Sequence, residues 1–231
     1  MAAFQYSLLD PDVAPAPSRL DRIRRAALSN GAWIDICPGW LSGADELFDD
    51  LLDSVPWRAE EREMYERVVA VPRLLSFYGE GDELPHPALE QAKQSLSEHY
   101  RDELGEAFVT TGLCLYRDGR DSVAFHGDRI GRGNSEDTMV AIVSLGTPRC
   151  LMLRPRRALE PTDEVSPMEP PAAEIHGRAA AANQSLRNNL GHGDLIVMGG
   201  SCQRTWEHGI PKTARPVGPR ISVQFRPRGV S

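Results

Sequence analysis

Two short stretches of the chain place a histidine and an aspartate two residues apart, a spacing that suits a metal site. They are DSVAFHGDRIGRG, with His126 and Asp128, and NNLGHGDLIVMGG, with His192 and Asp194. In a strand, residues i and i+2 point to the same face, so His126 and Asp128 would project together. Two histidines and one carboxylate on one face of a metal bind Fe(II) in non-haem oxygenases and leave positions for oxygen and a cosubstrate. His208, in QRTWEHGIPK, is the candidate third ligand.

The second triplet has a simpler explanation. Gly191 and Gly193 flank His192, and Asp194 begins the apolar run LIVM. We interpret this pattern as a turn that leads into a buried strand, with the aspartate accepting hydrogen bonds from turn amides. Because most His-x-Asp pairs bind nothing, the first triplet needs support from elsewhere in the chain.

The C-terminal segment RISVQFR carries the second arrangement that could do chemistry. With a period of two, a strand here places polar residues on one face (Arg220, Ser222, Gln224 and Arg226) and apolar residues on the other (Ile221, Val223 and Phe225). If the polar face meets solvent, this is an amphipathic edge strand. If it faces the inside of a barrel, the two guanidinium groups need anions, and a small dicarboxylate would satisfy both.

The elements that must position these residues change character along the chain. Before residue 107 we expect a strand and turn at 31–41, a helix capped by Ser42 over 43–55, strand-like chain at 68–81, and a helix over 86–104 that opens at Pro87. After residue 107 short strands alternate with turns, which predicts a sandwich or barrel, with a jelly roll among the candidates. The seven expected strands are FVTTGLCLYR, DSVAFHGD, DTMVAIVSLG, RCLMLRPR, DLIVMGG, RTWEHGI and PRISVQFRP.

These elements divide the chain into three parts. We expect a partly loose N-terminal arm over residues 1–30, helices and strands over 31–106, and a β core over 107–231. Within the core, residues 158–185 are rich in proline, alanine and acidic residues, which predicts a long mobile loop.

The composition limits the class of protein. The chain has 231 residues, 41% of them hydrophobic, which suffices for one sizeable core. No apolar run reaches the ~20 residues that span a bilayer, and the N-terminus lacks a signal-peptide pattern, so we expect a cytoplasmic protein without a membrane partner. We also expect a monomer. The four cysteines are widely spaced and form no CxxC pair, which favours reduced thiols.

The net charge of −7 argues against a nucleic-acid partner, but the charge is uneven. Residues 111–231 carry 16 Lys and Arg against 12 Asp and Glu, whereas residues 1–110 carry 10 against 21. A basic second half allows a local positive face, although ordinary solvated surface explains the same asymmetry. The clusters RIRR (22–25) and LRPRR (153–157) could meet phosphates or could lie on solvated faces.

In these motifs the chain resembles the AlkB-type Fe(II)- and 2-oxoglutarate-dependent dioxygenases, which repair alkylated nucleic acids. The matching pieces, in the family's order over residues 107–228, are LYRDGRDSVAFHGD, VSLG, GDLIVMGG, QRTWEHGIPK and RISVQFRP. VPRLLSFYGEG is similar to part of the nucleotide-recognition lid of relatives. The resemblance implies a mainly β, α+β fold: a double-stranded β-helix (jelly-roll) core with flanking helices and an N-terminal subdomain that forms a substrate lid.

The resemblance also implies roles for individual residues. It makes three residues the Fe(II) ligands: His126, Asp128 and His208. It pairs Arg220, aided by Tyr116, with the distal carboxylate of 2-oxoglutarate, and places Arg226 near the metal-bound end. The implied reaction consumes O2, forms succinate and carbon dioxide, and hydroxylates an N-alkyl group that then leaves as an aldehyde.

The implied substrate is alkylated DNA or RNA, single-stranded or with the target base flipped out. Tyr78 is the candidate lid contact and Trp206 the candidate pocket wall, although each could be a packed structural aromatic. Relatives commonly carry asparagine at the positions of Cys114 and Ser222, beside the cosubstrate, and an acid that meets the damaged base at the position of Ile130. These departures affect contacts to the cosubstrate and the base and leave the oxidative chemistry untouched.

Two other functions stay open. A dioxygenase of the same chemistry could act on a protein or a small molecule, which Ile130 and the net acidity favour. A non-catalytic nucleic-acid-binding or scaffold protein could use the same fold. The complete set of candidate iron and cosubstrate residues argues against the latter, because a pure binding module does not need it.

Overall fold

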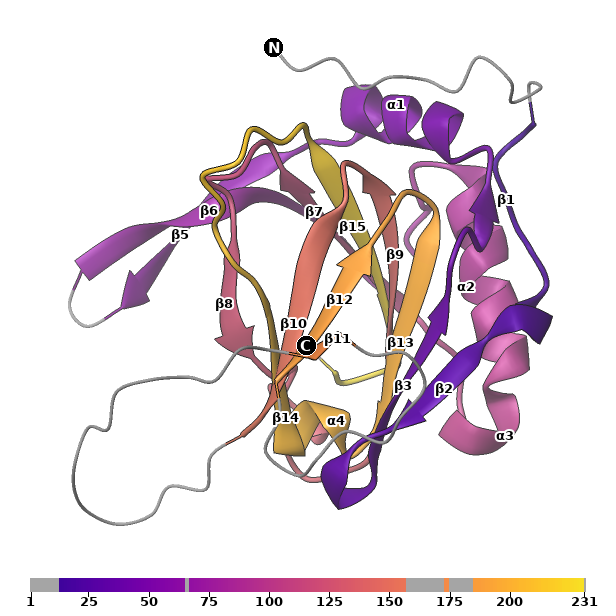
Figure 1. Ribbon diagram of the computed structural model, residues 1–231. Coiled ribbons are helices and arrows are strands. Elements are labelled where there is room, and N and C mark those ends of the chain that lie inside the picture. Colours follow the sequence, from indigo (N-terminus) through magenta and orange to yellow (C-terminus); the bar gives the residue numbers. More distant parts are fainter. Residues whose placement is uncertain (1–12, 65–66, 157–172, 175–184, 231) are drawn as a thin grey trace, which may run out of the picture.

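The computed structural model describes residues 13–64, 67–156, 173–174 and 185–230. Two β-sheets face each other, and the helices α1 (Ala44–Ser54), α2 (Pro87–His99) and α3 (Arg101–Leu104) lie on the outer side of the larger sheet (Figure 1). The prediction of a mainly β protein with a jelly-roll core and flanking helices is therefore confirmed, while the substrate lid stays a prediction.

The larger sheet has eight strands in the order β2-β3-β13-β9-β15-β7-β6-β5. They are β2 (Arg24–Ala27), β3 (Ala32–Cys37), β5 (Arg58–Met64), β6 (Arg67–Tyr78), β7 (Thr110–Tyr116), β9 (Val140–Gly146), β13 (Asp194–Gly200) and β15 (Arg220–Arg226). The smaller sheet has the order β11-β12-β10-β14-β8. Its strands are β8 (Val123–His126), β10 (Arg149–Pro155), β11 (Ala173–Glu174), β12 (Leu186–Leu190) and β14 (Trp206–Ile210).

Short elements complete the described chain. The strands β1 (Ala16–Pro17) and β4 (Leu41–Ser42) pair with each other, and α4 (Cys202–Thr205) leads into β14. Single 3-10 turns lie at Leu20–Arg22, Ser29–Gly31 and Arg132–Asn134. Within the described part of the chain, none of the helices has the length and apolar character needed to cross a membrane.

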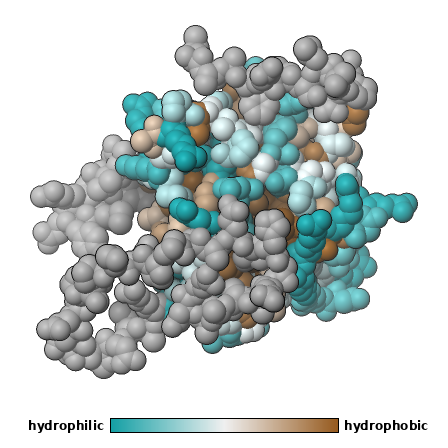
Figure 2. All heavy atoms as spheres, viewed as in Figure 1, coloured by the Kyte–Doolittle hydropathy of each residue, from teal (hydrophilic) through white to brown (hydrophobic). Residues whose placement is uncertain are grey.

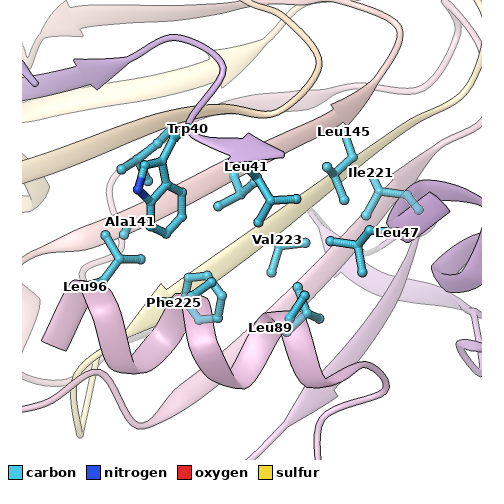
Figure 3. Close-up of a cluster of buried hydrophobic side chains, with 14 of the residues drawn as sticks. Trp40, Leu41, Leu47, Leu89, Leu96, Ala141, Leu145, Ile221, Val223 and Phe225 are labelled. Atoms are coloured by element: carbon cyan, nitrogen blue, oxygen red, sulfur yellow. The ribbon is translucent and has the colours of Figure 1, made fainter. Parts of the chain in front are cut away.

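The alternation of side chains along the strands produces two apolar cores. The outer face of the larger sheet packs against α1 and α2, where Val223, Phe225 and Leu89 are fully buried (Figure 3). The inner face packs against the smaller sheet, where Ile196 meets Leu153 in a second buried cluster. Residues of opposite parity on one strand therefore end in different cores, and this parity decides which side chains reach the space between the sheets.

All seven strands expected after residue 107 are present, as β7, β8, β9, β10, β13, β14 and β15. Other strands of the described chain were not expected, among them β5 and β12. In β12 the sequence LRNNL buries Asn188 between Leu186 and Leu190, so a polar residue interrupts the apolar alternation that marks a strand. Most of the expected loop at 158–185 lies outside the described residues.

The helix expected over 86–104 is divided into α2 and α3, and it opens at Pro87 as predicted. The Nδ1 atom of His86 caps α2 by accepting the backbone N–H of Ala88 at 3.1 Å. The prediction that Ser42 caps α1 is wrong. Gly43 is the N-cap, at φ 59°, and the Ser42 hydroxyl donates to the carbonyl of Ala16.

The N-terminal region contains two short strands. Residues 16–17 and 24–27 form β1 and β2, and β2 pairs with β3 along the larger sheet, whereas residues 1–12 lie outside the described part. The division at residues 31–106 and 107–231 stays a prediction. Hydrophilic residues cover the outer strand β2 and α3, at the lower right of Figure 2. The four cysteines are free, as expected.

Candidate metal centre and cosubstrate pocket

His126 and His208 are brought together by strand pairing. They lie directly opposite each other on the neighbouring strands β8 and β14, and their ring centroids are 4.4 Å apart. At Gly127 the backbone passes close to the carbonyl oxygen of Gln203. A Cβ atom at residue 127 would lie 2.1 Å from that oxygen. Glycine at the centre of the triplet therefore allows the close approach that turns Asp128 toward the histidines.

Asp128 completes a cluster of three potential ligands. Its Oδ1 atom lies 3.6 Å from Nε2 of His126, and one ligand atom from each of His126, Asp128 and His208 lies within 4.8 Å of the others. The Oδ2 atom accepts a hydrogen bond from Nε of Arg226 at 2.7 Å. The backbone N–H of Asp128 donates to Oε1 of Gln203 at 3.0 Å. Arg226 thus holds the Oδ2 atom of the carboxylate, and the Oδ1 atom is directed at His126.

The protonation states of Asp128 and His208 suit a metal site. The Nδ1 atom of His126 lies 2.9 Å from the carbonyl oxygen of Ala124, which accepts its N–H and leaves the Nε2 lone pair for a metal. Burial and the neighbouring His126 lower the pKa of His208 to about 3. Burial alone would raise the pKa of Asp128, but Arg226 and the two histidines outweigh it and lower the value to about 2. Near neutral pH an ionised Asp128 thus faces a neutral His208.

The second HGD triplet makes the turn that the sequence predicts. The carboxylate of Asp194 accepts the backbone N–H of Gly39 at 2.8 Å and that of Gly191 at 2.6 Å. Nδ1 of His192 accepts the N–H of Gly146 at 2.7 Å, and its Nε2 lies 3.0 Å from Oδ1 of Asp45. The side chains of His192 and Asp194 therefore stabilise the turn before β13.

The polar face of β15 points into the space between the sheets, as one of the two interpretations predicted. Arg220 is 1% exposed and lies beside Tyr116 of β7 and Gly146 of β9. Its Nε atom donates to Oγ of Ser144 at 2.9 Å, and its Cζ lies 5.4 Å from the Tyr116 ring centroid. Its buried Nη1 has no hydrogen-bond partner among the described residues. A buried guanidinium with a free donor fits an anion such as a carboxylate.

The remaining inward residues lie between Arg220 and the histidine cluster. Cys114 and Ser222 are paired across β7 and β15, and both are buried. Nε2 of Gln224 lies 3.4 Å from the Cys114 sulfur and 3.4 Å from the Ser222 hydroxyl oxygen. The residues of β7 and β15 predicted to bind the cosubstrate therefore lie on one inner face. They are Cys114, Tyr116, Arg220, Ser222 and Arg226, and Arg226 also contacts Asp128.

The two aromatic residues expected to contact the substrate, Tyr78 and Trp206, are packed against other parts of the protein. Tyr78 pairs with Thr111, which pairs with Phe225, so its side chain belongs to the outer face and packs against the helix-side core. Trp206 is 1% exposed, and its indole N–H donates to the carbonyl of Ser29 at 3.3 Å. Both aromatics therefore have packing partners, and their predicted roles as lid contact and pocket wall stay predictions.

Two exposed apolar residues lie nearer to the metal side. Phe77, one residue before Tyr78, pairs with Gly112, which pairs with Gln224, so its side chain shares the inner face and is 65% exposed. Ile130 is 73% exposed. The neighbouring Gly131 bridges to Val230 near the end of the chain.

The sequence interpretation missed three residues of this site. Gln203 holds the backbone of Asp128, Gln224 contacts Arg226, and Phe77 shares the inner face with Gln224. The alternation of β15 already placed Gln224 inward. Gln203 lies in the short helix α4, and Phe77 depends on the register of β6, which the sequence alone does not give.

Comparison with known proteins identifies the family. Residues 35–226 match the model of the 2OG-Fe(II) oxygenase superfamily. The chain belongs to this superfamily. This oxygenase is 28% identical over 218 residues to the Bos taurus alpha-ketoglutarate-dependent dioxygenase alkB homolog 3, a match that covers 84% of this chain and 67% of that protein. It is 26% identical over 237 residues to the Homo sapiens protein of the same name, covering 94% and 76%.

Two further similarities agree with this assignment. The oxygenase is 32% identical over 136 residues to the Arabidopsis thaliana DNA oxidative demethylase ALKBH2, covering 58% of this chain and 42% of that protein. The solved structure of OsALKBH1 has the same fold, with a TM-score of 0.52 at 13% identity, covering 88% and 99% of the two chains. The protein is thus an AlkB-type 2-oxoglutarate-dependent dioxygenase, and its cofactors are Fe(II), 2-oxoglutarate and O2.

Proposed function

We propose that this oxygenase removes alkyl groups oxidatively from bases of DNA or RNA. The observation that carries the proposal is a pair of features in the space between the two sheets: three potential metal ligands, and the buried Arg220 with an unpaired Nη1. The similarity to an alkB homolog 3 and to a DNA oxidative demethylase supports nucleic acid as the substrate.

His126, Asp128 and His208 are the proposed Fe(II) ligands. Two imidazoles and one carboxylate suit a divalent iron and leave coordination positions for oxygen and a cosubstrate. When bound, Fe(II) with 2-oxoglutarate and O2 supplies the oxidising chemistry that hydroxylates a C–H bond, with succinate and carbon dioxide as coproducts. The chain itself holds the ligands: Ala124 fixes the His126 tautomer, and Arg226 fixes Asp128.

Arg220 is the proposed partner of the distal carboxylate of 2-oxoglutarate. Its Nη1 is buried without a partner, and the hydroxyl-bearing Tyr116 lies beside it. Arg226, which already contacts Asp128, is placed to act at the metal end. Cys114 and Ser222 line the face between the two arginines.

Phe77 is the proposed stacking surface for a flipped or single-stranded base. Its ring is exposed on the inner face, whereas Tyr78 is packed in the helix-side core. An aromatic ring offers ~1–3 kcal/mol per stacked base without sequence preference. Ile130, exposed two residues after Asp128, gives an apolar contact where an acid would accept a hydrogen bond from a base amine.

The arginine clusters RIRR (22–25) and LRPRR (153–157) have less positive charge available to phosphates than their sequence suggests. Arg25 donates to Asp35 and Glu103 through its side chain, and its guanidinium stacks on Trp33. Arg154 pairs with Glu207 and stacks on Phe125. Neighbouring acids therefore neutralise part of both clusters, and the proposed binding to nucleic acid depends on the base pocket more than on the clusters.

The test combines binding and product analysis. Anaerobic protein should bind Fe(II) and then 2-oxoglutarate. In air it should restore alkylated single- or double-stranded oligonucleotides and release succinate. A protein that binds both cofactors and consumes 2-oxoglutarate only with a protein or small-molecule substrate would replace the proposal by that alternative, which the net charge of −7 favours.

A further inference from the structure

The peptide group between Gly127 and Asp128 is hydrogen-bonded at both ends. Its carbonyl oxygen, on Gly127, accepts the backbone N–H of Arg129 at 2.8 Å. Its N–H, on Asp128, donates to Oε1 of Gln203 at 3.0 Å, a contact between residues 75 positions apart. The first hydrogen bond belongs to a tight local turn, whereas the second ties that turn to another part of the fold.

The backbone of Gln203 supports the same turn from below Gly127. A Cβ atom at residue 127 would lie 2.1 Å from the carbonyl oxygen of Gln203 and 3.2 Å from that of Trp206, so a glycine is needed for this close packing. Gln203 lies in α4, which leads directly into β14 and its proposed ligand His208 (Figure 1). The segment that delivers one proposed ligand therefore also supports the turn that delivers Asp128.

The carboxamide of Gln203 meets Asp128 through its oxygen. A backbone N–H can only donate, so the atom that faces it must be the acceptor end of the amide. The side chain is 1% exposed, and its Nε2 atom is buried with no hydrogen-bond partner among the described residues. Oε1 is therefore the end of this side chain that acts on the metal centre.

A neutral acceptor suits this position. The Asp128 carboxylate is buried, and Arg226 contacts it through Oδ2. A glutamine oxygen accepts the Asp128 N–H without adding a second negative charge beside that carboxylate. An apolar side chain at residue 203 would leave the N–H buried and unpaired, which is unfavourable.

We propose that Gln203 is a positioning residue for Asp128: by accepting its backbone N–H, Gln203 fixes the turn over residues 126–129 in the metal-free protein, so that the carboxylate is in place before a metal binds. The inference rests on the proposed ligand set of this oxygenase. A site ordered in advance has less to order on binding. Residues that orient metal ligands typically contribute roughly 10–100-fold to metal affinity.

The test compares Fe(II) affinities by calorimetry under anaerobic conditions. Gln203→Leu removes the acceptor and should bind Fe(II) at least about tenfold more weakly than the wild type. Gln203→Glu is the rescue variant. Its carboxyl oxygen accepts the same N–H, and any negative charge on it attracts the metal, so it should bind Fe(II) at least as tightly as the wild type.

A control variant separates positioning from damage to α4. Thr205→Val removes a hydroxyl that donates to the carbonyl of Ser201 within the same segment and leaves the contact to Asp128 intact. It should bind Fe(II) as the wild type does. Metal-free thermal unfolding identifies the temperatures at which each variant is folded, and Gln203→Met repeats the test if Gln203→Leu does not fold.

Three results would overturn the inference. They are an unchanged Fe(II) affinity without the acceptor at residue 203, an equal loss in Thr205→Val, and a similar loss in Gln203→Glu, which would show that the shape of the side chain matters and its acceptor does not. A wild-type protein that binds no Fe(II) would instead contradict the proposed metal ligands.

Discussion

Nε of Arg226 donates to Oδ2 of Asp128 over 2.7 Å, joining the last strand of the larger sheet to the proposed metal ligand at the end of β8. Asp128 is almost fully buried, and a buried carboxylate without a partner is strongly unfavourable. The pair therefore keeps Asp128 ionised and directed at His126, and it ties the inner face of β15 to the metal centre.

The unfolding free energy of the metal-free protein should depend on pH through His208. Burial first, and then His126, lower the pKa of His208 from 6.5 to about 3. The unfolded chain therefore takes up this proton as the pH falls through 6.5, whereas the folded protein does not until about pH 3. The unfolding free energy should therefore decrease as the pH is lowered from 6.5 to about 3, by at most ~1.4 kcal/mol per pH unit. Urea titrations of the wild type and His208→Gln should show a shallower dependence in the variant; parallel curves would contradict the assignment.

Arg220→Ala should weaken 2-oxoglutarate binding far more than Arg228→Ala. Arg220 is buried with an unpaired Nη1, whereas Arg228 is exposed and pairs with Glu80. Removing one partner of a buried charge pair costs roughly 2–5 kcal/mol. Calorimetry on the Fe(II)-loaded variants measures the difference, and equal affinities would show that Arg220 does not contact the cosubstrate.

Phe77→Ala should raise the KM for a single-stranded substrate by about tenfold, since a stacked base contributes ~1–3 kcal/mol. Tyr78→Phe is the matched control, because this ring lies in the helix-side core and should leave KM unchanged. Steady-state kinetics with one alkylated oligonucleotide compares the two variants. If only the Tyr78 variant changes KM, the register of β6 does not determine the base contact.

Ile130→Asp should move substrate preference toward bases with an exocyclic amine. The apolar side chain of Ile130 offers no hydrogen-bond acceptor. An exocyclic amine of the base that is left without a partner costs ~1–3 kcal/mol of binding free energy. The wild type should therefore discriminate poorly among methylated adenine and cytosine, or should prefer a cyclic adduct without that amine. A competition assay with one lesion per oligonucleotide should show a shift of roughly tenfold, equal to ~1.4 kcal/mol. The same ranking of lesions in both proteins would place residue 130 away from the base.

The sequence predicts much of this site because its main features are local. The i, i+2 spacing places His126 and Asp128 together, and the alternation of β15 places Arg220 and Arg226 on one face. Glycines on both sides of His192 identify the second triplet as a turn.

Other features depend on relationships that no local pattern contains. Whether Phe77 or Tyr78 faces the site follows from the register of β6 against β7. Ser42 has the right residue type for a helix cap, but its hydroxyl donates to Ala16, which lies far away in the sequence. The contact between Gln224 and Cys114 joins residues 110 positions apart, which only the folded sheet brings together.

The most direct test of the proposed function is mass spectrometry of oligonucleotides that each carry one alkylated base. The oligonucleotides are incubated in air with the Fe(II)-loaded protein and 2-oxoglutarate. We predict restored bases, with one succinate formed for each alkyl group removed, for the wild type and for Arg228→Ala. Asp128→Asn, which lacks a proposed iron ligand, should give none. Unchanged alkylated bases in a wild-type protein that binds Fe(II) and 2-oxoglutarate, or repair that persists in Asp128→Asn, would contradict the account.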